Sequence, residues 1–463
     1  MFNTQGNWIA LLMVFLWPLA AVYIYRLKPI QYATIWVVLG GFMLLPVRTQ
    51  IDLPFVPALG KDTIPALSAF FAMWYIKKTK LVVFGKDGTV KILLLMLMIG
   101  PFFTALFNSS PLNFNGYYVH GLSPYDGMSL MMNQSMLILP LLMGRQFFRT
   151  YESQLLLFKL LVGAGLIYSI PVLYEVRMSP QLHSMLYGYF PHSFAQQWRD
   201  GGFRPVVFMG HGLWVAFFSA IVLIAAAALW EIKVKVRNIS AMLTHYYFLF
   251  LLVLCKSSAS LIYGVFSVLM LKLTSSHTQH KAAILLVCLA LLYPVLSTSK
   301  LFPHQQILNV AESISPDRAQ SLEFRFDNED QLLAHARKHM VFGWGGWGRN
   351  RVRDEETGAD VSVTDGRWII KLGVYGAVGF IAEFGLLALI VFRAMQASKY
   401  VTDKKEKTIL SAHALMVGIT MIDQLPNATL APWLWLLAGI LLGRSEQILV
   451  DHKVKFNKDR YVQ

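Results

Sequence analysis

Apolar runs recur along nearly the whole chain. Each is close to the roughly 20 residues that a helix needs to cross the hydrocarbon core of a bilayer. The clearest runs lie near residues 7–25, 91–107, 127–144, 153–174, 206–230, 239–255, 281–297, 372–393 and 430–443. Shorter or weaker runs lie near residues 32–47, 63–76, 258–272 and 408–425. Only 14% of the residues are charged, whereas soluble domains have about 25%. The runs predict an all-α polytopic membrane protein with roughly 12 to 14 spanning helices.

The basic residues predict an orientation, because Lys and Arg are held preferentially in cytoplasmic loops. They fall on every second loop, as Arg26 and Lys28, then Lys77, Lys78 and Lys80, then Arg145 and Arg149, then Lys233, Lys235 and Arg237, then Lys272 and Lys281, then Lys404, Lys405 and Lys407. The C-terminal residues Lys453, Lys455, Lys458 and Arg460 fall on the same side. This register makes the C-terminus cytoplasmic and the N-terminus external. The first run lacks a basic start and a small-residue cleavage site, so we expect it to be retained as a helix.

The same pattern divides the chain into four parts. Residues 1–298 are expected to hold ten spanning helices with short loops, and residues 299–371 a large external loop with short surface helices. Residues 372–443 complete the spans, and residues 444–463 form a basic cytoplasmic tail. The net charge of +15 then follows mainly from topology, and the tail is expected to meet anionic lipid rather than nucleic acid. Cys255 and Cys288 lie in or at apolar runs and predict neither a disulfide nor a zinc site.

Four segments are expected to face outward with enough length to carry chemistry: residues 48–62, 108–126, 175–205 and 299–371. The third leads through "QQWRDGGFRPVVFMGHG", residues 196 to 212, into an apolar run. Arg204 stands at the mouth of this run and His211 lies inside it. An ionisable group at such depth usually faces a cavity or a partner. A snorkelling arginine and a satisfied buried histidine are the alternative interpretations.

The fourth segment contains a loose helical pattern followed by glycines. Leu322, Phe326, Leu332 and Leu333 recur at helical spacing and predict an amphipathic helix on the membrane surface, with Arg325 on or near its apolar face. The helix is expected to end by Gly343, because four glycines in six residues cannot hold it.

The stretch "FGWGGWGRN", residues 342 to 350, contains a literal G-x-G-x-x-G. No strand precedes it and no helix begins at its end, so a dinucleotide site is rejected. We expect a glycine-permitted turn with Trp344 and Trp347 at the membrane interface or against a sugar ring. Residues 349–360 are interpreted as a solvated charged loop. Asp365 and Arg367 differ, because they lie at the entry of the next helix.

Taken in order, these elements resemble those of the bacterial O-antigen polymerase and O-antigen ligase superfamily of polytopic glycosyltransferases. "FRPVVFMGHG" is similar to the family's Arg-containing element before a span, and "LCKSSASLIYGVF", residues 254 to 266, is similar to a helix start in which Lys256 and Ser257 stand near the usual polar pair. "LEFRF", "FGWGGWG" and "VTDGRWIIKLGVYGAVGFIAEFG" resemble the external-loop signature. The resemblance covers roughly residues 195 to 385 and implies a fold like that of glycosyltransferases of the C class.

The resemblance implies an enzyme that uses oligosaccharides on undecaprenyl diphosphate at the outer face of the inner membrane, in O-antigen (lipopolysaccharide) or exopolysaccharide synthesis. The expected activity is metal-independent, inverting glycosyl transfer without a cofactor. With no metal, guanidinium groups must meet the charge of the leaving diphosphate. Arg204 and Arg325 are the candidates, with Arg177 or Arg367 beside them, and Lys256, Trp344 and Trp347 are candidate substrate contacts. The cluster "DNED", residues 327 to 330, is interpreted as the polar side of a surface helix and not as a metal site.

The acceptor hydroxyl needs a base, for which Asp365 is the first candidate and His211 the second. Ligases of the family carry a His near the position of Thr364, Asp365 and Gly366, so the acidic residue here favours a polymerase that adds the growing glycan to a new lipid-linked repeat. A chain-length regulator is a conceivable partner of such an enzyme. A ligase that hands finished glycan to a lipid or protein acceptor, and a flippase for lipid-linked glycan, remain the alternatives. No internal repeat supports transport.

Overall fold

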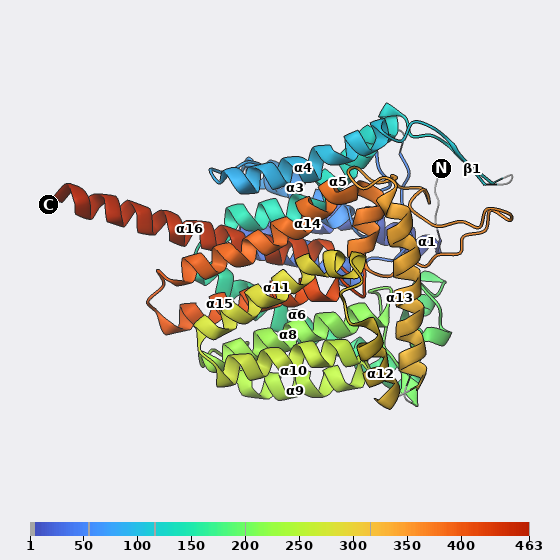
Figure 1. Ribbon diagram of the computed structural model, residues 1–463. Helices are drawn as coiled ribbons and strands as arrows, with labels where there is room; N and C mark the ends of the chain where they lie inside the picture. The colour runs from blue at the N-terminus through green and yellow to red at the C-terminus, as the bar shows by residue number, and fades with distance from the viewer. Residues whose placement is uncertain (1–4, 54–55, 115–116, 200, 315, 463) are drawn as a thin grey trace.

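The apolar runs form helices that lie side by side in one bundle (Figure 1). The computed structural model describes residues 5–53, 56–114, 117–199, 201–314 and 316–462. In this part of the chain, eight helices are long and apolar enough to cross a membrane. They are α1 (Trp8–Leu27), α4 (Gly88–Leu106), α5 (Pro124–Phe147), α6 (Tyr151–Met178), α8 (Gly212–Glu231), α11 (Ser276–Thr298), α14 (Arg367–Ser398) and α16 (Pro432–Val462). The prediction of an all-α polytopic membrane protein is thereby confirmed.

Five further helices complete the bundle. Four are short and apolar, namely α2 (Ile30–Leu44), α3 (Ile64–Ile76), α9 (Ala241–Leu254) and α10 (Ser258–Leu273). The fifth is α15 (Lys404–Asp423). Each predicted apolar run corresponds to one of these thirteen helices. The run predicted at 206–230 becomes helical only at Gly212, because His211 is extended and its ring caps α8 by accepting from the Leu213 N–H.

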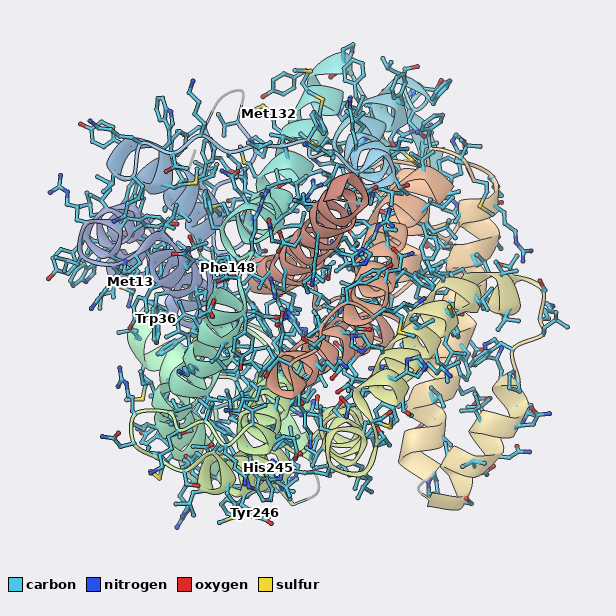
Figure 2. All side chains as sticks on the ribbon, turned by 90° about the vertical axis from the view of Figure 1, so that its left-hand side faces the viewer. Met13, Trp36, Met132, Phe148, His245 and Tyr246 are labelled. Carbon is cyan, nitrogen blue, oxygen red and sulfur yellow. The ribbon has the colours of Figure 1, made fainter. Side chains whose placement is uncertain are left out.

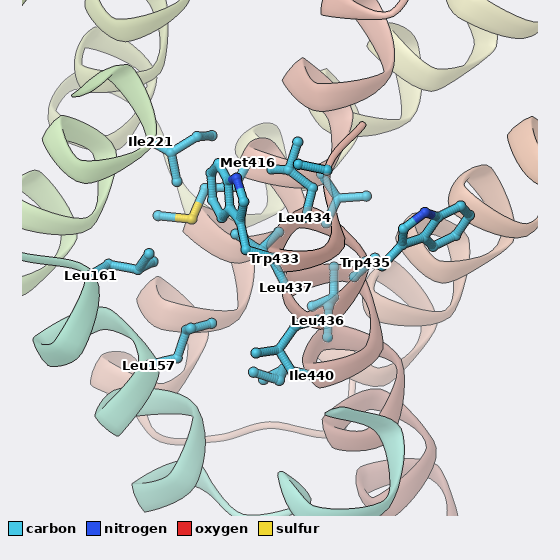
Figure 3. Close-up of a cluster of buried hydrophobic side chains, with 14 of the residues drawn as sticks. Leu157, Leu161, Ile221, Met416, Trp433, Leu434, Trp435, Leu436, Leu437 and Ile440 are labelled. Carbon is cyan, nitrogen blue, oxygen red and sulfur yellow. The ribbon is translucent and has the colours of Figure 1, made fainter. Parts of the chain in front are cut away.

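The apolar surface of the bundle is turned outward. Large apolar side chains such as Phe15, Ile170 and Tyr246 are exposed, and Tyr246 lies on the periphery when the bundle is viewed along its helices (Figure 2). A water-soluble monomer rarely exposes so much apolar area. The centre is filled from α8 and α16, where side chains such as Ile221, Trp433 and Leu437 pack together (Figure 3). Helices that are apolar on all sides belong in such an interior.

The irregular segments gather at one end of the bundle, at the right in Figure 1, and the two termini lie at opposite ends. This end carries α7 (Leu182–Tyr187), the short helix η1 (Ala195–Gln197), α12 (His304–Ile314) and α13 (Pro316–Arg337). It also carries two antiparallel hairpins, β1 (Leu112–Phe114) with β2 (Tyr117–Val119) and β3 (Trp198–Arg199) with β4 (Gly202–Phe203). We call it the loop end. At the other end α16 continues as a helix through the predicted tail and projects from the bundle.

The predicted amphipathic helix is α13. Leu332, Leu333 and Ala336 are buried beneath it. The helix ends at Arg337, before Gly343 as expected. Arg325 lies on its buried side, where the pattern placed it, and Figure 1 shows α13 lying across the ends of the spanning helices.

A spanning helix, α14, is broken at Gly376, where φ is 65° and ψ is −164°. In an unbroken helix the N–H groups of residues 377 and 378 would bond to the carbonyls of 373 and 374. Here the segment 340–345 lies between these N–H groups and these carbonyls. Its Trp344 and Gly345 N–H groups donate to the carbonyls of 373 and 374, at 2.8 and 2.9 Å, and the N–H groups of 377 and 378 donate to the Met340 and Val341 carbonyls, at 2.7 and 3.2 Å.

Glycine makes this insertion possible. A Cβ on Gly343 would lie 2.5 Å from the backbone carbon and oxygen of Val374, and one on Gly376 would lie 2.3 Å from the Val341 oxygen. Gly343, Gly345 and Gly348 all have positive φ, a conformation that only glycine adopts at little cost. The predicted glycine-permitted turn is confirmed, and its role is to close the break in α14.

Candidate active site

Charged side chains from separate segments gather at the loop end, near the starts of α3, α8, α10 and α14. Lys61, just before α3, donates to the Phe208 carbonyl just before α8, at 2.8 Å. Arg204 donates to the Lys256 carbonyl just before α10, at 3.0 Å. Asp365, just before α14, lies 3.4 Å from Arg325. The N-terminus of a helix carries a partial positive charge, so four such ends and several cations make this region suited to an anion.

Arg204 is only 5% exposed, and its chain packs over Gly212, where a Cβ would lie 2.1 Å from it. Lys256 is in the left-handed region, with φ of 49°, and its Nζ donates to the Arg199 carbonyl at 3.0 Å. The two cations therefore tie the β3–β4 hairpin to the turn between α9 and α10. The stretch "CKSSAS" forms this turn.

His211 lies near both predicted arginines. Its pKa is lowered to about 3, first by burial and then by repulsion from His192, Arg204, Arg199 and Arg325. Its Nδ1 accepts from the Leu213 N–H at 3.0 Å, which places the ring proton on Nε2. In this tautomer His211 can donate a hydrogen bond to a ligand, but it has no free nitrogen to accept a proton.

Arg325 and Asp365 form a half-exposed ion pair at the wall of an apolar cavity of about 370 Å³. Arg325 also approaches the Pro426 carbonyl at 3.5 Å. The cavity lies between α13 and the ends of α11 and α15, and its other walls include Leu289, Leu296 and Ile422. A cation and a carboxylate beside an apolar cavity fit a ligand with a polar head and an apolar tail.

The cluster predicted as the polar side of α13 is partly turned inward at Glu329. Its carboxylate accepts from the Tyr293 hydroxyl, at 2.9 and 3.0 Å, and from the Ser297 hydroxyl, at 2.6 Å. The pKa of Glu329 is raised to about 7, mainly by burial and also by Asp330, while the hydrogen bonds from the α11 hydroxyls hold it down in part. Glu329 thus fastens α13 to α11 beside the cavity.

This contact makes the attachment of α13 sensitive to pH. The pKa of Glu329 is raised from 4.5 to about 7, so its contribution to stability is fully present below the lower value and is lost as pH rises through the upper one, at most ~3 kcal/mol. Unfolding temperature in detergent should fall between about pH 4.5 and about pH 7, and Glu329→Gln should flatten that change. Glu323→Gln, an exposed site on the same helix, should leave it as in the wild type; an unchanged profile in Glu329→Gln would contradict the assignment.

Arg367 is held inside a buried ionic network. Its guanidinium donates to both oxygens of Glu383, at 2.5 and 2.9 Å, and Glu383 is 0% exposed. Lys371 lies 2.9 Å from the same carboxylate and donates to Gln134 at 3.0 Å. Residues sixteen apart in a straight helix would be separated by about 24 Å, so this contact depends on the break in α14. Arg367 therefore orients the start of α14 rather than standing open to a phosphate.

The other predicted substrate contacts, Trp344, Trp347 and Arg177, lie in different environments. Trp344 is 8% exposed, stacks on His335, contacts the tilted ring of His339 and donates to the His335 carbonyl at 2.9 Å. Its expected position at the interface or on a sugar ring is therefore corrected to the inside of the loop. Trp347 is 57% exposed and is open to a ligand. Arg177 is exposed at the end of α6, and among the described residues no contact joins it to the cluster.

The charged run 349–360 is solvated except at its start. Arg349 is 2% exposed and donates to the carbonyls of Trp344, His120 and Ser110, at 3.0, 2.8 and 3.0 Å. This corrects its interpretation as a solvated residue, because it locks segment 108–126 to the glycine turn. Further along, Arg351 pairs with Asp360 at 2.6 Å on the surface.

Among the described residues at this end, Lys61, Asp62, Lys371 and Glu383 are ionisable and were not predicted as part of the site. Glu383 lies within the apolar run at 372–393 and Lys371 directly precedes it, and an ionisable residue in such a run is itself a signal of function or of buried pairing. Asp62 is a single carboxylate in a short segment and has no pattern around it. Arg204, His211, Arg325 and Asp365, the four predicted catalytic residues, come from three distant segments and lie at the same end.

No protein-family model matches the chain, and no curated protein matches it.

Proposed function

We propose that the chain is a glycan polymerase of the bacterial inner membrane. It transfers a growing glycan from undecaprenyl diphosphate onto the non-reducing end of a new lipid-linked repeat unit. In this proposal thirteen helices span the bilayer and the loop end faces the periplasm. The basic loops and the projecting end of α16 lie in the cytoplasm, as Lys and Arg prefer.

The observation that carries the proposal is that Arg204 and Arg325 lie near His211 at the end where α3, α8, α10 and α14 begin, with Arg325 in the wall of an apolar cavity. A lipid diphosphate has an anionic head and a long apolar tail, and this arrangement offers a place for each. Guanidinium groups stay charged and bind phosphate oxygens in a fixed geometry. Positive charge placed where the leaving group gains its electrons lowers the barrier of the transfer.

The chemical step is a single displacement. The acceptor hydroxyl oxygen forms a bond to the anomeric carbon of the glycan, while the bond from that carbon to the phosphate oxygen breaks. The electron pair leaves with the diphosphate, and a carboxylate takes the proton of the hydroxyl. Attack from the side opposite the leaving group inverts the anomeric carbon. Trp347, exposed on the glycine turn, is available to contact a sugar face.

Deleting the gene and sizing the undecaprenyl-linked glycans extracted from the cells tests the proposal. A polymerase predicts that single repeats accumulate at the outer face and long chains disappear. Long chains that pile up on the carrier would instead identify a ligase. Repeats that stay on the cytoplasmic face would identify a transporter and would refute the polymerase.

Arg325→Ala should lower chain growth at least about 100-fold, the usual loss when a charge-stabilising donor is removed. The protein should still insert and reach normal levels, because Arg325 is half-exposed. Arg351→Ala removes a surface arginine of the same external segment and should keep wild-type chain growth. Equal activity of the two variants would contradict the proposed role of Arg325.

A further inference from the structure

Asp62 lies just before α3 at the loop end, in the external segment 48–62. Its side chain is exposed to water, yet it is densely surrounded by protein, so it lines a recess in the end of the bundle. No other described residue forms a hydrogen bond with its carboxylate. A carboxylate with open lone pairs inside a recess can accept a hydrogen bond from a ligand hydroxyl.

Two cations face Asp62, Lys61 from its own segment and Arg367 from α14. Both are engaged elsewhere. The Lys61 Nζ donates to the Leu45 and Phe208 carbonyls, at 2.6 and 2.8 Å, and Arg367 is bound to Glu383. They act on Asp62 through space only. Burial raises the pKa of Asp62 from its ordinary value, and the two cations hold it down in part, which favours a stronger base that can still be ionised.

The residues around Asp62 connect it to two apolar cavities. The first is the cavity beside Arg325 and Asp365, and Arg367 follows Asp365 by two residues. The second, of about 490 Å³, runs between α1, α2 and α6, and its lining includes Leu44 and Phe208. Because Lys61 bonds to the Phe208 carbonyl and to that of Leu45, residue 61 lies at the loop end of this second cavity.

Two cavities suit two lipid tails, one for the donor and one for the acceptor. The first has the arginine that would hold a diphosphate, so it fits the donor. At the second, Lys61 bonds to the carbonyl of the lining residue Phe208 and Asp62 follows Lys61 in the chain, so this cavity fits the acceptor.

We propose that Asp62, and not Asp365, is the base that accepts the proton of the acceptor hydroxyl, with Asp365 holding Arg325 in position. This inference rests on the proposed polymerase function. The hydroxyl proton passes to an Asp62 oxygen as the new bond to the anomeric carbon forms and the diphosphate departs with its electron pair. Asp62 then releases the proton to water. Asp365 is suited to the positioning role, because its carboxylate faces the Arg325 guanidinium at 3.4 Å.

The test uses purified full-length protein and the lipid-linked repeats that accumulate in the deletion strain, with products resolved by size. Asp62→Asn should lower kcat at least about 100-fold, the range of general-base catalysis, with little change in KM and a normal unfolding temperature. Asp62→Glu keeps a carboxylate and should retain part of the activity, with the acid limb of its pH profile moved. Asp52→Asn, an exposed site in the same segment, should match the wild type.

Three results would overturn the inference. Wild-type kcat and an unchanged acid limb in Asp62→Asn, with Arg325→Ala inactive, would remove Asp62 from the reaction and leave the polymerase in place. A larger loss of kcat and loss of the acid limb in Asp365→Asn would make Asp365 the base. Failure of the wild-type protein to lengthen the repeats would refute both the function and this inference. If Asp62→Asn does not fold, the acid limb of Asp62→Glu decides, because an unmoved limb also excludes Asp62.

Discussion

Replacing Gly343 with alanine should destabilise the protein by at least ~3 kcal/mol. The new Cβ would lie 2.5 Å from the backbone of Val374, which cannot rotate away, and the φ of 69° is itself strained for alanine. Relief of the contact would push segment 340–345 out of the break and leave peptide groups of α14 without partners. Thermal unfolding in detergent and the amount of protein in the membrane measure the effect.

The same turn supplies matched controls. Gly348 has a φ of 79° but only the end of the Arg353 side chain nearby, at 3.4 Å, so Gly348→Ala should show backbone strain alone, ~1–2 kcal/mol. Gly346 has no atom within 4 Å of the added Cβ and no positive φ, so Gly346→Ala should unfold like the wild type. Equal unfolding temperatures for all three variants would show that the insertion into α14 is not tight.

Glu383→Gln should be comparably severe. The change leaves Arg367 and Lys371 buried together without a carboxylate, and removing one partner of a buried ion pair usually costs ~3–5 kcal/mol. We expect low yield and a markedly lower unfolding temperature in detergent. The start of α14 should also become more accessible to proteases, because the contact between Arg367 and Glu383 joins its two halves.

Asp360→Asn is the matched control, because it removes the carboxylate of a short ion pair that is partly exposed to water. Exposed pairs are worth ~0–1 kcal/mol, so this variant should differ little from the wild type. If the two variants lose similar stability, the network around Glu383 is not desolvated as the structure indicates.

The sequence was sufficient to find the spans, because the hydropathy of a span is a local property of about 20 residues. It was not sufficient to find the break in α14. That break depends on residues 340–345, more than thirty positions before Gly376, and on the hydrogen bonds that the two segments exchange. The late start of α8 likewise depends on the cap formed by His211.

The candidate site was predicted only in part, again because local patterns can be read from the sequence and contacts between distant segments cannot. Arg204, His211, Arg325 and Asp365 stand at or near helix mouths on the same side of alternating spans, so the topology alone brings them to one end. Trp344 and Arg349 were predicted to lie at the surface. Composition cannot show that a side chain is buried by contacts with carbonyls and histidines elsewhere in the chain. Asp62 has no sequence signal of its own and becomes visible only through the residues around it.

Residues 340–345 complete the backbone hydrogen bonds of α14, and this affects how the sequence of such a protein can diverge. The segment 299–371 is not an independent attachment, because it supplies two donors and two acceptors to the backbone of a membrane helix. A graft that exchanged residues 299–371 for an unrelated loop would leave those peptide groups facing hydrocarbon, at several kcal/mol each. We therefore expect recombination to be tolerated in the surface stretch 350–360 and resisted at the glycine turn.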